Sequence, residues 1–171
     1  MNEAGVVAFR AMRSDGRTGV YTWNGGAVSV IAESGGGAGF TGFEGLPLVD
    51  DEGRVVFRGD LADGRQGIFL AESGSIEALV LTGGRFAALA RFPDSDGAGT
   101  VCFVATLPAG VAGVFLVREG RLKLVIDSTG GFETFRGALV DAVGNVVFYG
   151  TPRGGHWAYT SAAGVRSACL G

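Results

Sequence analysis

The sequence predicts an all-β fold built from four tandem repeats. Each repeat opens with Asn or Asp, two further residues and a Gly, and a Phe follows that Gly by four residues. The openings begin at Asn2, Asp50, Asp96 and Asp141. Their Gly residues are 48, 46 and 45 positions apart, a period typical of repeat architectures.

A second motif recurs in register with the first. Gly, an apolar residue and an aromatic residue occur as Gly19-Val20-Tyr21, Gly67-Ile68-Phe69 and Gly113-Val114-Phe115, and the diverged fourth copy is Trp157-Ala158-Tyr159. Gly makes up 32 of the 171 residues, well above the usual share of about 7%. Because the motif glycines hold fixed repeat positions and there are only four Pro, the composition indicates ordered turns rather than disorder.

The second repeat shows the expected elements in order. A short apolar strand over residues 46–49 leads into a turn at Asp50-Asp51-Glu52-Gly53, where the Asp caps the turn and the Gly accepts a positive φ. Three further short strands are predicted from β-branched and aromatic residues at 54–59, 67–70 and 76–81. Hairpin-scale turns join all four strands.

Apolar residues occupy successive positions in these strands, as at 6–9, 79–81 and 146–148. Both faces of each sheet must then be covered, which excludes a sheet with one face exposed to solvent. Small sheets packed face to face around an axis meet this need in a β-propeller, whose four-stranded blades take about 40–50 residues. We therefore predict a β-propeller-like array of four blade-sized repeats, each with three to four antiparallel strands, in one domain over residues 1–171.

The repeats are expected at residues 2–45, 46–91, 92–137 and 138–171. The innermost strands are expected before the Asx turns, ending at Val49, at Asp94-Ser95 and at Val140. The first repeat lacks this strand because Met1 directly precedes Asn2, so fifteen strands are expected where four full blades need sixteen. An unpaired inner edge is a liability. We expect a longer array or a homodimer that completes a larger ring, and the alternative is a four-bladed ring whose first blade has three strands.

The pattern Asn/Asp-x-x-Gly-x-Val-x-Phe, followed by Gly-x-Gly-Val-Phe, resembles a class of bacterial tandem-repeat proteins. Its best examples here are Asn2-Glu3-Ala4-Gly5-Val6-Val7-Ala8-Phe9-Arg10-Ala11 and Asp63-Gly64-Arg65-Gln66-Gly67-Ile68-Phe69-Leu70. The resemblance covers essentially the whole chain and implies a propeller-like fold. Members of the class are mostly exported and have no assigned chemistry, so the resemblance implies an exported or extracellular location and supplies no catalytic residues.

Composition narrows the classes of function. The net charge of −3 gives no footprint for nucleic acid, and no stretch approaches the roughly 18 apolar residues of a membrane span. Cys102 and Cys169 occupy non-equivalent repeat positions, which favours two buried thiols over a disulfide framework. We expect no cofactor and no metal ion.

Two features offer candidate chemistry. Asp50-Asp51-Glu52 has the oxygen ligands that Ca²⁺ prefers, but the equivalents of Asp50 begin the turn in every repeat, which favours a structural role. His156 is the only histidine, and it lies where the fourth repeat departs from the pattern. Terminal repeats are commonly atypical, so a capping repeat is the preferred explanation there.

The remaining candidates are loop residues. In a propeller, the loops between the second and third strands share one face with the crossovers between blades. Candidate ligand-binding residues on that face are Arg17, Asp63, Arg65, Arg136, Arg153 and His156. Phe40, Phe86 and Phe132 also fall in the crossovers, but their matching positions predict core packing.

The favoured function is a non-catalytic binding or scaffold module that presents this loop face to a carbohydrate, another polar ligand or a protein. The alternative is a carbohydrate-active hydrolase or lyase that uses loop carboxylates such as Asp15, Asp60 and Asp63 with Arg17 or His156. Glycoside hydrolysis needs two carboxyl groups about 5–10 Å apart. Whether two of these carboxylates meet in a cleft separates the two functions.

Overall fold

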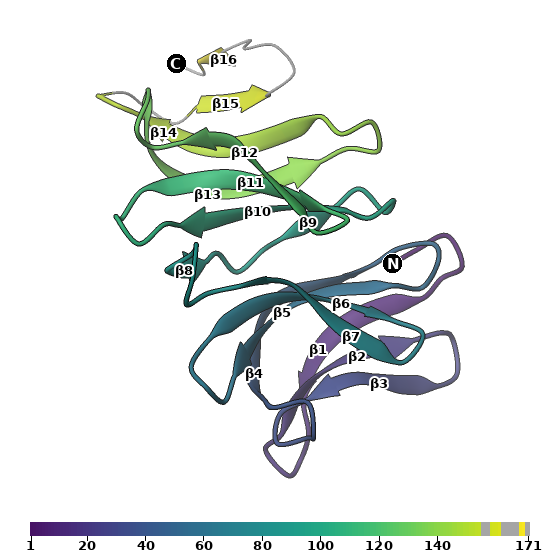
Figure 1. Ribbon diagram of the computed structural model, residues 1–171. Coiled ribbons are helices and arrows are strands. Elements are labelled where there is room, and N and C mark those ends of the chain that lie inside the picture. Colours follow the sequence, from purple (N-terminus) through teal and green to yellow (C-terminus); the bar gives the residue numbers. More distant parts are fainter. Residues whose placement is uncertain (155–157, 162–167, 170–171) are drawn as a thin grey trace. The chain divides into compact units, whose positions relative to one another are not determined.

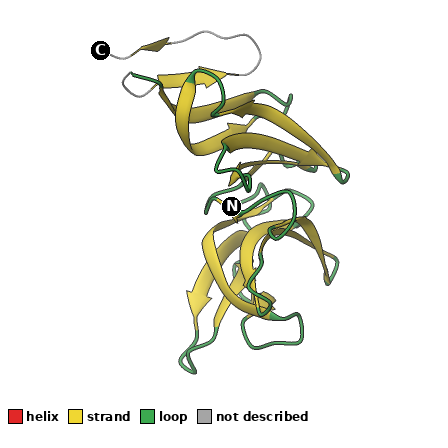
Figure 2. Cartoon of the chain, turned by 60° about the vertical axis from the view of Figure 1, so that its left-hand side comes forward, coloured by secondary structure: helices red, strands yellow, loops and turns green. Residues whose placement is uncertain are grey.

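The computed structural model consists of β-strands joined by turns (Figure 1). It describes residues 1–154, 158–161 and 168–169, the last two ranges by their backbone alone. The described residues form four antiparallel sheets and contain no helix (Figure 2), so the all-β prediction is confirmed. The chain divides into two compact units, Met1–Leu81 and Thr82–Gly171, and each unit contains two sheets.

The first unit holds the sheets of the first two repeats. The first sheet consists of β1 (Val7–Met12), β2 (Thr18–Trp23) and β3 (Val28–Glu33) in that order. The second sheet consists of β4 (Phe40–Val49), β5 (Val55–Leu61), β6 (Gln66–Glu72) and β7 (Ser75–Leu81). Every strand pairs with its neighbours in the sequence, so each sheet is a meander of hairpins.

The second unit repeats this arrangement. Its first sheet consists of β8 (Ala88–Leu89), β9 (Asp94–Ser95), β10 (Thr100–Thr106), β11 (Ala112–Arg118) and β12 (Arg121–Asp127). Both β8 and β9 pair with β10, so together they form an interrupted inner strand. The last sheet consists of β13 (Phe132–Val140), β14 (Val146–Pro152), β15 (Ala158–Ser161) and β16 (Ala168–Cys169).

The inner strands end where the sequence predicts, at Val49, Ser95 and Val140, and no inner strand pairs with β1 among the described residues. Two of them begin earlier than the expected repeat boundaries. β4 starts at Phe40 rather than at 46, and β13 starts at Phe132 rather than at 138. Fifteen strands are expected, and the described strands are numbered to β16. The extra strand arises because the third inner strand is split into β8 and β9.

The Asx-x-x-Gly turns are structural in all four repeats. An Oδ1 atom of Asn2, Asp50, Asp96 and Asp141 accepts the amide of the residue four positions later, at 2.8 Å in each case. The closing glycines have φ between +78° and +97°, the left-handed region that other residues rarely adopt. The two turns of the first unit also touch, since Asn2 Nδ2 donates to the Asp50 carbonyl at 2.8 Å.

The Gly-apolar-aromatic motif has a packing cause. The aromatic ring folds back over the glycine two residues earlier, and a Cβ on Gly67 would lie 2.5 Å from the ring of Phe69. A Cβ on Gly19 would lie 2.6 Å from the Tyr21 hydroxyl oxygen, and one on Gly113 would lie 2.9 Å from the Phe115 ring. A register shift precedes the aromatic residue each time. Only glycine leaves room for the ring there.

Within each unit, one sheet packs its back face on the front face of the next. We define the front face as the one carrying the repeat Phe, namely Phe9, Phe57, Phe103 or Phe148, and the back face as the opposite one. In the first unit, Val20 and Ala32 from the back of the first sheet join Phe57 and Phe69 in one core. In the second unit, Cys102, Val104 and Val114 join Phe148 in the same way.

The crossover phenylalanines belong to the core, as predicted. Phe40 and Phe86 are each 3% exposed, and Phe40 lies edge-on to Phe69 with ring centroids 4.9 Å apart. Phe86 makes the equivalent contact with Phe115 at 4.9 Å. Cys102 is fully buried, and burial raises the pKa of its thiol to about 12.

Candidate functional site

The predicted loop residues Asp63 and Arg65 form one self-contained turn. Leu61 and Arg65 close the hairpin, and Gly64 takes a φ of +84°. Asp63 Oδ1 accepts the Arg65 amide at 3.0 Å, and Asp63 Oδ2 accepts Arg65 Nε at 2.7 Å. The Arg65 amide and guanidinium thereby lower the pKa of the Asp63 carboxyl. The two side chains stabilise their own turn.

Arg17 lies in the matching turn of the first repeat, with an additional partner. Its guanidinium contacts Asp15 at 2.7 Å and Glu33, at the end of β3, at 3.5 Å. Arg13 contacts the same two carboxylates, at 3.7 Å and 3.1 Å respectively. The four side chains therefore form a closed network of charges at one end of the first sheet.

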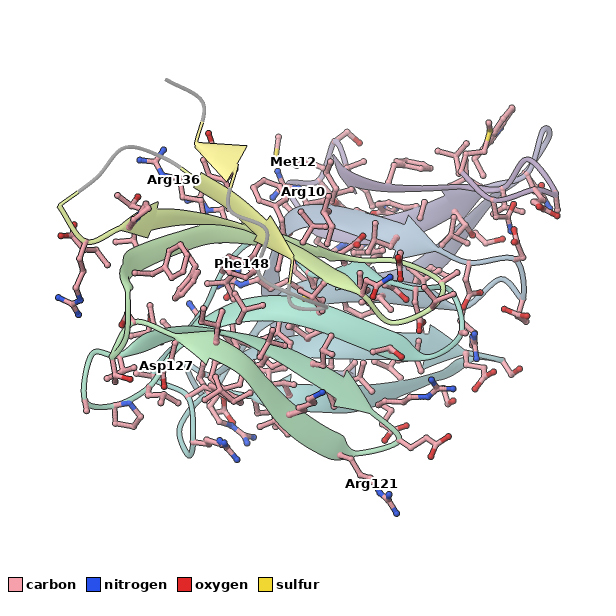
Figure 3. All side chains as sticks on the ribbon, turned by 90° about the horizontal axis from the view of Figure 1, so that it is seen from above. Arg10, Met12, Arg121, Asp127, Arg136 and Phe148 are labelled. Carbon is pink, nitrogen blue, oxygen red and sulfur yellow. The ribbon has the colours of Figure 1, made fainter. Side chains whose placement is uncertain are left out.

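The other predicted site residues are scattered. Arg153 donates from its guanidinium to the carbonyls of Ser128 and Gly130, at 2.6 Å and 2.9 Å, and so ties one loop to another within the second unit. Arg136 projects from β13 and is exposed (Figure 3). His156 lies outside the described residues. Of the five predicted residues that the structure describes, only Asp63 and Arg65 bond to each other.

The acidic residues that follow β4, Asp50-Asp51-Glu52, hydrogen-bond within and beside their own turn. Asp50 accepts the Arg54 amide at 2.8 Å and Arg54 Nε at 2.6 Å, and Asp51 accepts the Glu3 amide at 2.8 Å. Within the described part of the chain, no group of three His, Cys, Asp or Glu side chains is arranged to hold a metal ion.

The structure shows a cluster that the sequence reasoning missed. In the first repeat, Arg13, Tyr21 and Glu33 occupy the positions that Leu61, Phe69 and Leu81 occupy in the second. Arg13 and Leu61 each follow the repeat Phe by four residues, and Glu33 and Leu81 pair with the motif glycines Gly19 and Gly67. In the second repeat, all three positions are part of the packed core.

The three substituted side chains bind one another. The Tyr21 hydroxyl donates to Glu33 Oε1 at 2.9 Å, and Arg13 donates to the same oxygen at 3.1 Å. We call Arg13, Asp15, Arg17, Tyr21 and Glu33 the Glu33 cluster. In the third repeat only the last position is polar, and that residue, Asp127, bonds instead to Thr129 in its own loop. Aligning the repeats position by position reveals the change, because Tyr21 stands where Phe69 and Phe115 occur.

The cluster keeps its carboxylates ionised. Hydrogen bonds from Arg13 and then Tyr21 lower the pKa of Glu33, and the Arg17 guanidinium lowers the pKa of Asp15. Burial, together with the hydrogen bond to Glu33, raises the pKa of Tyr21. These shifts favour a fixed array of charges and do not favour proton transfer near neutral pH.

An apolar strip lies beside the cluster on the same front face. Trp23 pairs with Val28 across β2 and β3, and Val30 pairs with Tyr21, so all three lie on the Tyr21 side of the sheet. Trp23, Val28 and Val30 are 43%, 59% and 57% exposed. The front face of the first sheet therefore presents apolar and hydrogen-bonding groups side by side. A depression of about 160 Å³ between β3 and the β6–β7 turn shares Val30 with this strip. It is small for a ligand pocket and is lined by none of the predicted site residues.

Comparison with known proteins gives no family for this chain. No protein-family model matches the sequence, and no curated protein is significantly similar to it. Among the described residues, no helix is long and apolar enough to span a membrane.

Proposed function

We propose that the protein is a non-catalytic binding or scaffold module whose binding surface is the front face of its first sheet. The observation that carries this proposal is the joint replacement of three core positions by Arg13, Tyr21 and Glu33 beside the exposed Trp23. Trp, Tyr and Arg are enriched among the residues that carry binding energy at protein interfaces. The surface therefore differs from the loop face expected from the sequence.

We further propose that the four sheets are the blades of a propeller-like array. The front-to-back packing of sheets within each unit and the contact between the Asn2 and Asp50 turns support this architecture. The homodimer that would complete a larger ring stays a prediction. Size-exclusion chromatography with light scattering tests it, and a monomer of 17.4 kDa would contradict it.

The enzymatic alternative gains no support from the carboxylates. Asp15 and Glu33 are near neighbours, since both contact Arg17, but the pKa of each is lowered. A glycosidase acid needs a raised pKa so that it stays protonated until it donates. Asp60 lies 3.4 Å from Arg58, and Asp63 is held by Arg65.

A binding test separates these functions. Fluorescently labelled protein is applied to arrays of glycans and of peptides, and a panel of glycoside substrates is assayed in parallel. We expect binding that is lost in the Trp23→Ser/Glu33→Gln variant and kept in Asp63→Asn/Arg65→Gln, which alters the matching loop of the second repeat. Substrate turnover that disappears in Asp15→Asn would overturn the proposal, and so would binding that both double variants lose equally.

A further inference from the structure

The turn that joins β2 to β3 contains the step Asn24-Gly25 (Figure 1). All residues from 23 to 30 are exposed. In an Asn–Gly step the side-chain amide carbon lies close to the next backbone nitrogen, and glycine places no side chain in the way. Among the described residues, none beyond the chain neighbours of Gly25 has an atom within 4 Å of the position that a Cβ would occupy. The Gly25 nitrogen is therefore open to approach.

Neither of the two neighbouring amides is held by a hydrogen bond. The Asn24 side-chain amide and the Gly25 backbone amide make no hydrogen bond with any residue that the structure describes. The Asn24 backbone amide donates to the Ala27 carbonyl at 3.3 Å. Since β2 ends at Trp23 and β3 begins at Val28, Asn24 lies beyond the paired residues of the hairpin. Its side chain can rotate toward the Gly25 nitrogen without breaking a bond.

The matching hairpins of the next two repeats are closed more tightly. Their strands pair as far as Glu72 and Arg118, the residues in the place of Asn24. Both residues of each turn then have a positive φ, the pattern of a tight two-residue hairpin. In the first repeat, φ is positive at Gly25 but not at Gly26. The first repeat thus combines an Asn–Gly step with the loosest of the three turns.

Asn2 lacks the freedom of Asn24. Its Nδ2 atom donates to the Asp50 carbonyl and its Oδ1 atom accepts the Val6 amide, both at 2.8 Å. The backbone amide that follows it, that of Glu3, donates to Asp51 at 2.8 Å. Attack by this nitrogen on the Asn2 side chain would require these bonds to break first.

Asn145 is also held by its turn. Its Nδ2 atom donates to Asp141 Oδ2 at 2.8 Å, and the next residue, Val146, is β-branched and 2% exposed. Three Asp–Gly steps have carboxylates that accept the amide two residues ahead, those of Asp15, Asp63 and Asp96. A carboxylate is in addition a poorer electrophile than an amide. Asn24 is therefore the most reactive of these positions.

We propose that Asn24 is a deamidation site that reacts through a cyclic imide. The Gly25 nitrogen loses its proton to hydroxide and attacks Cγ of Asn24, a C–N bond forms, and the side-chain nitrogen leaves as ammonia. Water then opens the five-membered ring. Breaking the new bond to Cγ gives aspartate, whereas breaking the original peptide bond gives isoaspartate, whose chain continues through Cγ. Each conversion consumes one water and releases one ammonia.

Both products change the end of the front face. A carboxyl group with an ordinary pKa of about 3.9 is ionised at neutral pH, so a negative charge appears next to the exposed Trp23. Isoaspartate also adds one carbon atom to the backbone of the turn, which should loosen the pairing of Trp23 with Val28. The conversion needs no ligand on this face, so it is independent of the proposed binding function.

Peptide mapping locates the reaction, because trypsin isolates each asparagine in its own peptide. Residues 1–10, 18–54 and 137–153 contain Asn2, Asn24 and Asn145 respectively. The protein is incubated at physiological temperature and mildly alkaline pH, with a parallel sample at mildly acidic pH. Mass spectrometry follows the replacement of the side-chain NH₂ by OH in each peptide. An isoaspartyl methyltransferase with a labelled methyl donor measures isoaspartate.

We expect peptide 18–54 to convert about tenfold faster than the other two, since hydrogen bonds must break first at Asn2 and Asn145. Isoaspartate should form in this peptide, and the rate should rise with pH because the Gly25 nitrogen must lose its proton. Unfolding in urea should speed conversion at Asn2, which loses its protecting bonds, and should leave the rate at Asn24 nearly unchanged.

Two variants test the chemistry. Asn24→Gln keeps a side-chain amide but requires a six-membered ring, which closes far more slowly, so the conversion should disappear. Gly26→Ala is the matched control, because its Cβ would meet open space and the Asn24-Gly25 step is unchanged, so the conversion should persist. Equal rates in the three peptides, deamidation without isoaspartate, or equal acceleration of Asn2 and Asn24 on unfolding would overturn the proposal.

Discussion

The hydroxyl of Tyr21 donates a hydrogen bond of 2.9 Å to Glu33 Oε1, at a point where the second repeat packs Phe69 against Leu81. Because of this bond, the pKa of Tyr21 responds to changes in the Glu33 cluster. Burial raises the pKa of Tyr21 above its ordinary value, and the hydrogen bond to Glu33 and the negative charge of Glu33 raise it further.

The Tyr21 titration gives the first prediction. Glu33→Gln removes the negative charge and weakens the hydrogen bond, so the pKa of Tyr21 should fall toward its ordinary value while staying raised by burial. The measurement is the pH titration of tyrosine ring carbons by NMR, assigned with Tyr21→Phe. The control is Glu77→Gln, on the exposed side of β7, which should leave the Tyr21 titration unchanged.

A second prediction concerns the motif glycine of the second repeat. Gly67→Ala would place a Cβ 2.5 Å from the Phe69 ring and 2.8 Å from Leu81, which forces a rearrangement of the core. We expect a loss of about 1–3 kcal/mol in the free energy of unfolding, measured by urea denaturation. Gly137→Ala is the matched control, because no atom lies within 4 Å of its Cβ position and the strand should tolerate it. Equal effects of the two substitutions would contradict the packing explanation.

These examples show how much of the structure follows from the sequence. The Asx-x-x-Gly period identified the turns because each turn depends on a local hydrogen bond. The opening side chain accepts the amide of the residue four positions later, at Asn2, Asp50, Asp96 and Asp141. The inner-strand ends could be predicted for the same reason. The strand beginnings could not, since Phe40 pairs with Leu61 across a register shift that no local pattern shows.

The candidate site was harder to predict because its residues are identified by comparison between repeats. Arg17 and Arg65 look like exposed binding residues in a single repeat, but each is bonded to the Asp two positions earlier. The Glu33 cluster joins residues from a turn and two strands, and Tyr21 and Glu33 are twelve residues apart. Only the pairing of β2 with β3 brings them together.

The third prediction tests the Asx turn. Asp96 Oδ1 accepts the amides of Ala98 and Thr100, each at 2.8 Å. Asp96→Ala removes both bonds and should lower the free energy of unfolding by about 1 kcal/mol, similar to the loss of a helix-capping side chain. Asp96→Asn keeps the acceptor oxygen, as Asn2 does in the first repeat, and should restore most of the stability. Loss of equal size in both variants would show that charge, rather than the acceptor, stabilises the turn.

The fourth prediction concerns the thiol of Cys102, which is fully buried beside Val104 and Val114 in the core of the second unit. Burial, followed by the charge of Asp94, raises its pKa to about 12, so very little thiolate exists near pH 8. In a Cys169→Ser variant, Cys102 should not react with a disulfide reagent until the protein unfolds. The absorbance of the released thiol, followed with and without urea, measures this. Rapid labelling of the native protein would contradict the burial.

The last prediction is the response to acid. The pKa values of Asp15, Glu33, Asp96 and Asp127 are lowered in the folded protein. Burial opposes the shift at each of them, most strongly at Asp96, but the hydrogen bonds together outweigh it. Ordinary values are 3.8 for Asp and 4.5 for Glu. As pH falls through this range, the unfolded chain takes up protons that the folded chain does not. The stabilisation from these groups is therefore complete above about pH 5 and is lost progressively below it.

Urea denaturation at a series of pH values tests this response. The free energy of unfolding should be nearly flat from pH 7 to about 5 and fall below that, as the sign of the linkage requires. Glu33→Gln removes one titrating group, so its curve should be shallower in acid than that of the unaltered protein, whereas Glu77→Gln, exposed on β7, should follow the unaltered curve more closely. A Glu33→Gln curve parallel to the unaltered one throughout the acid range would mean that Arg13 and Tyr21 do not hold Glu33 ionised in solution.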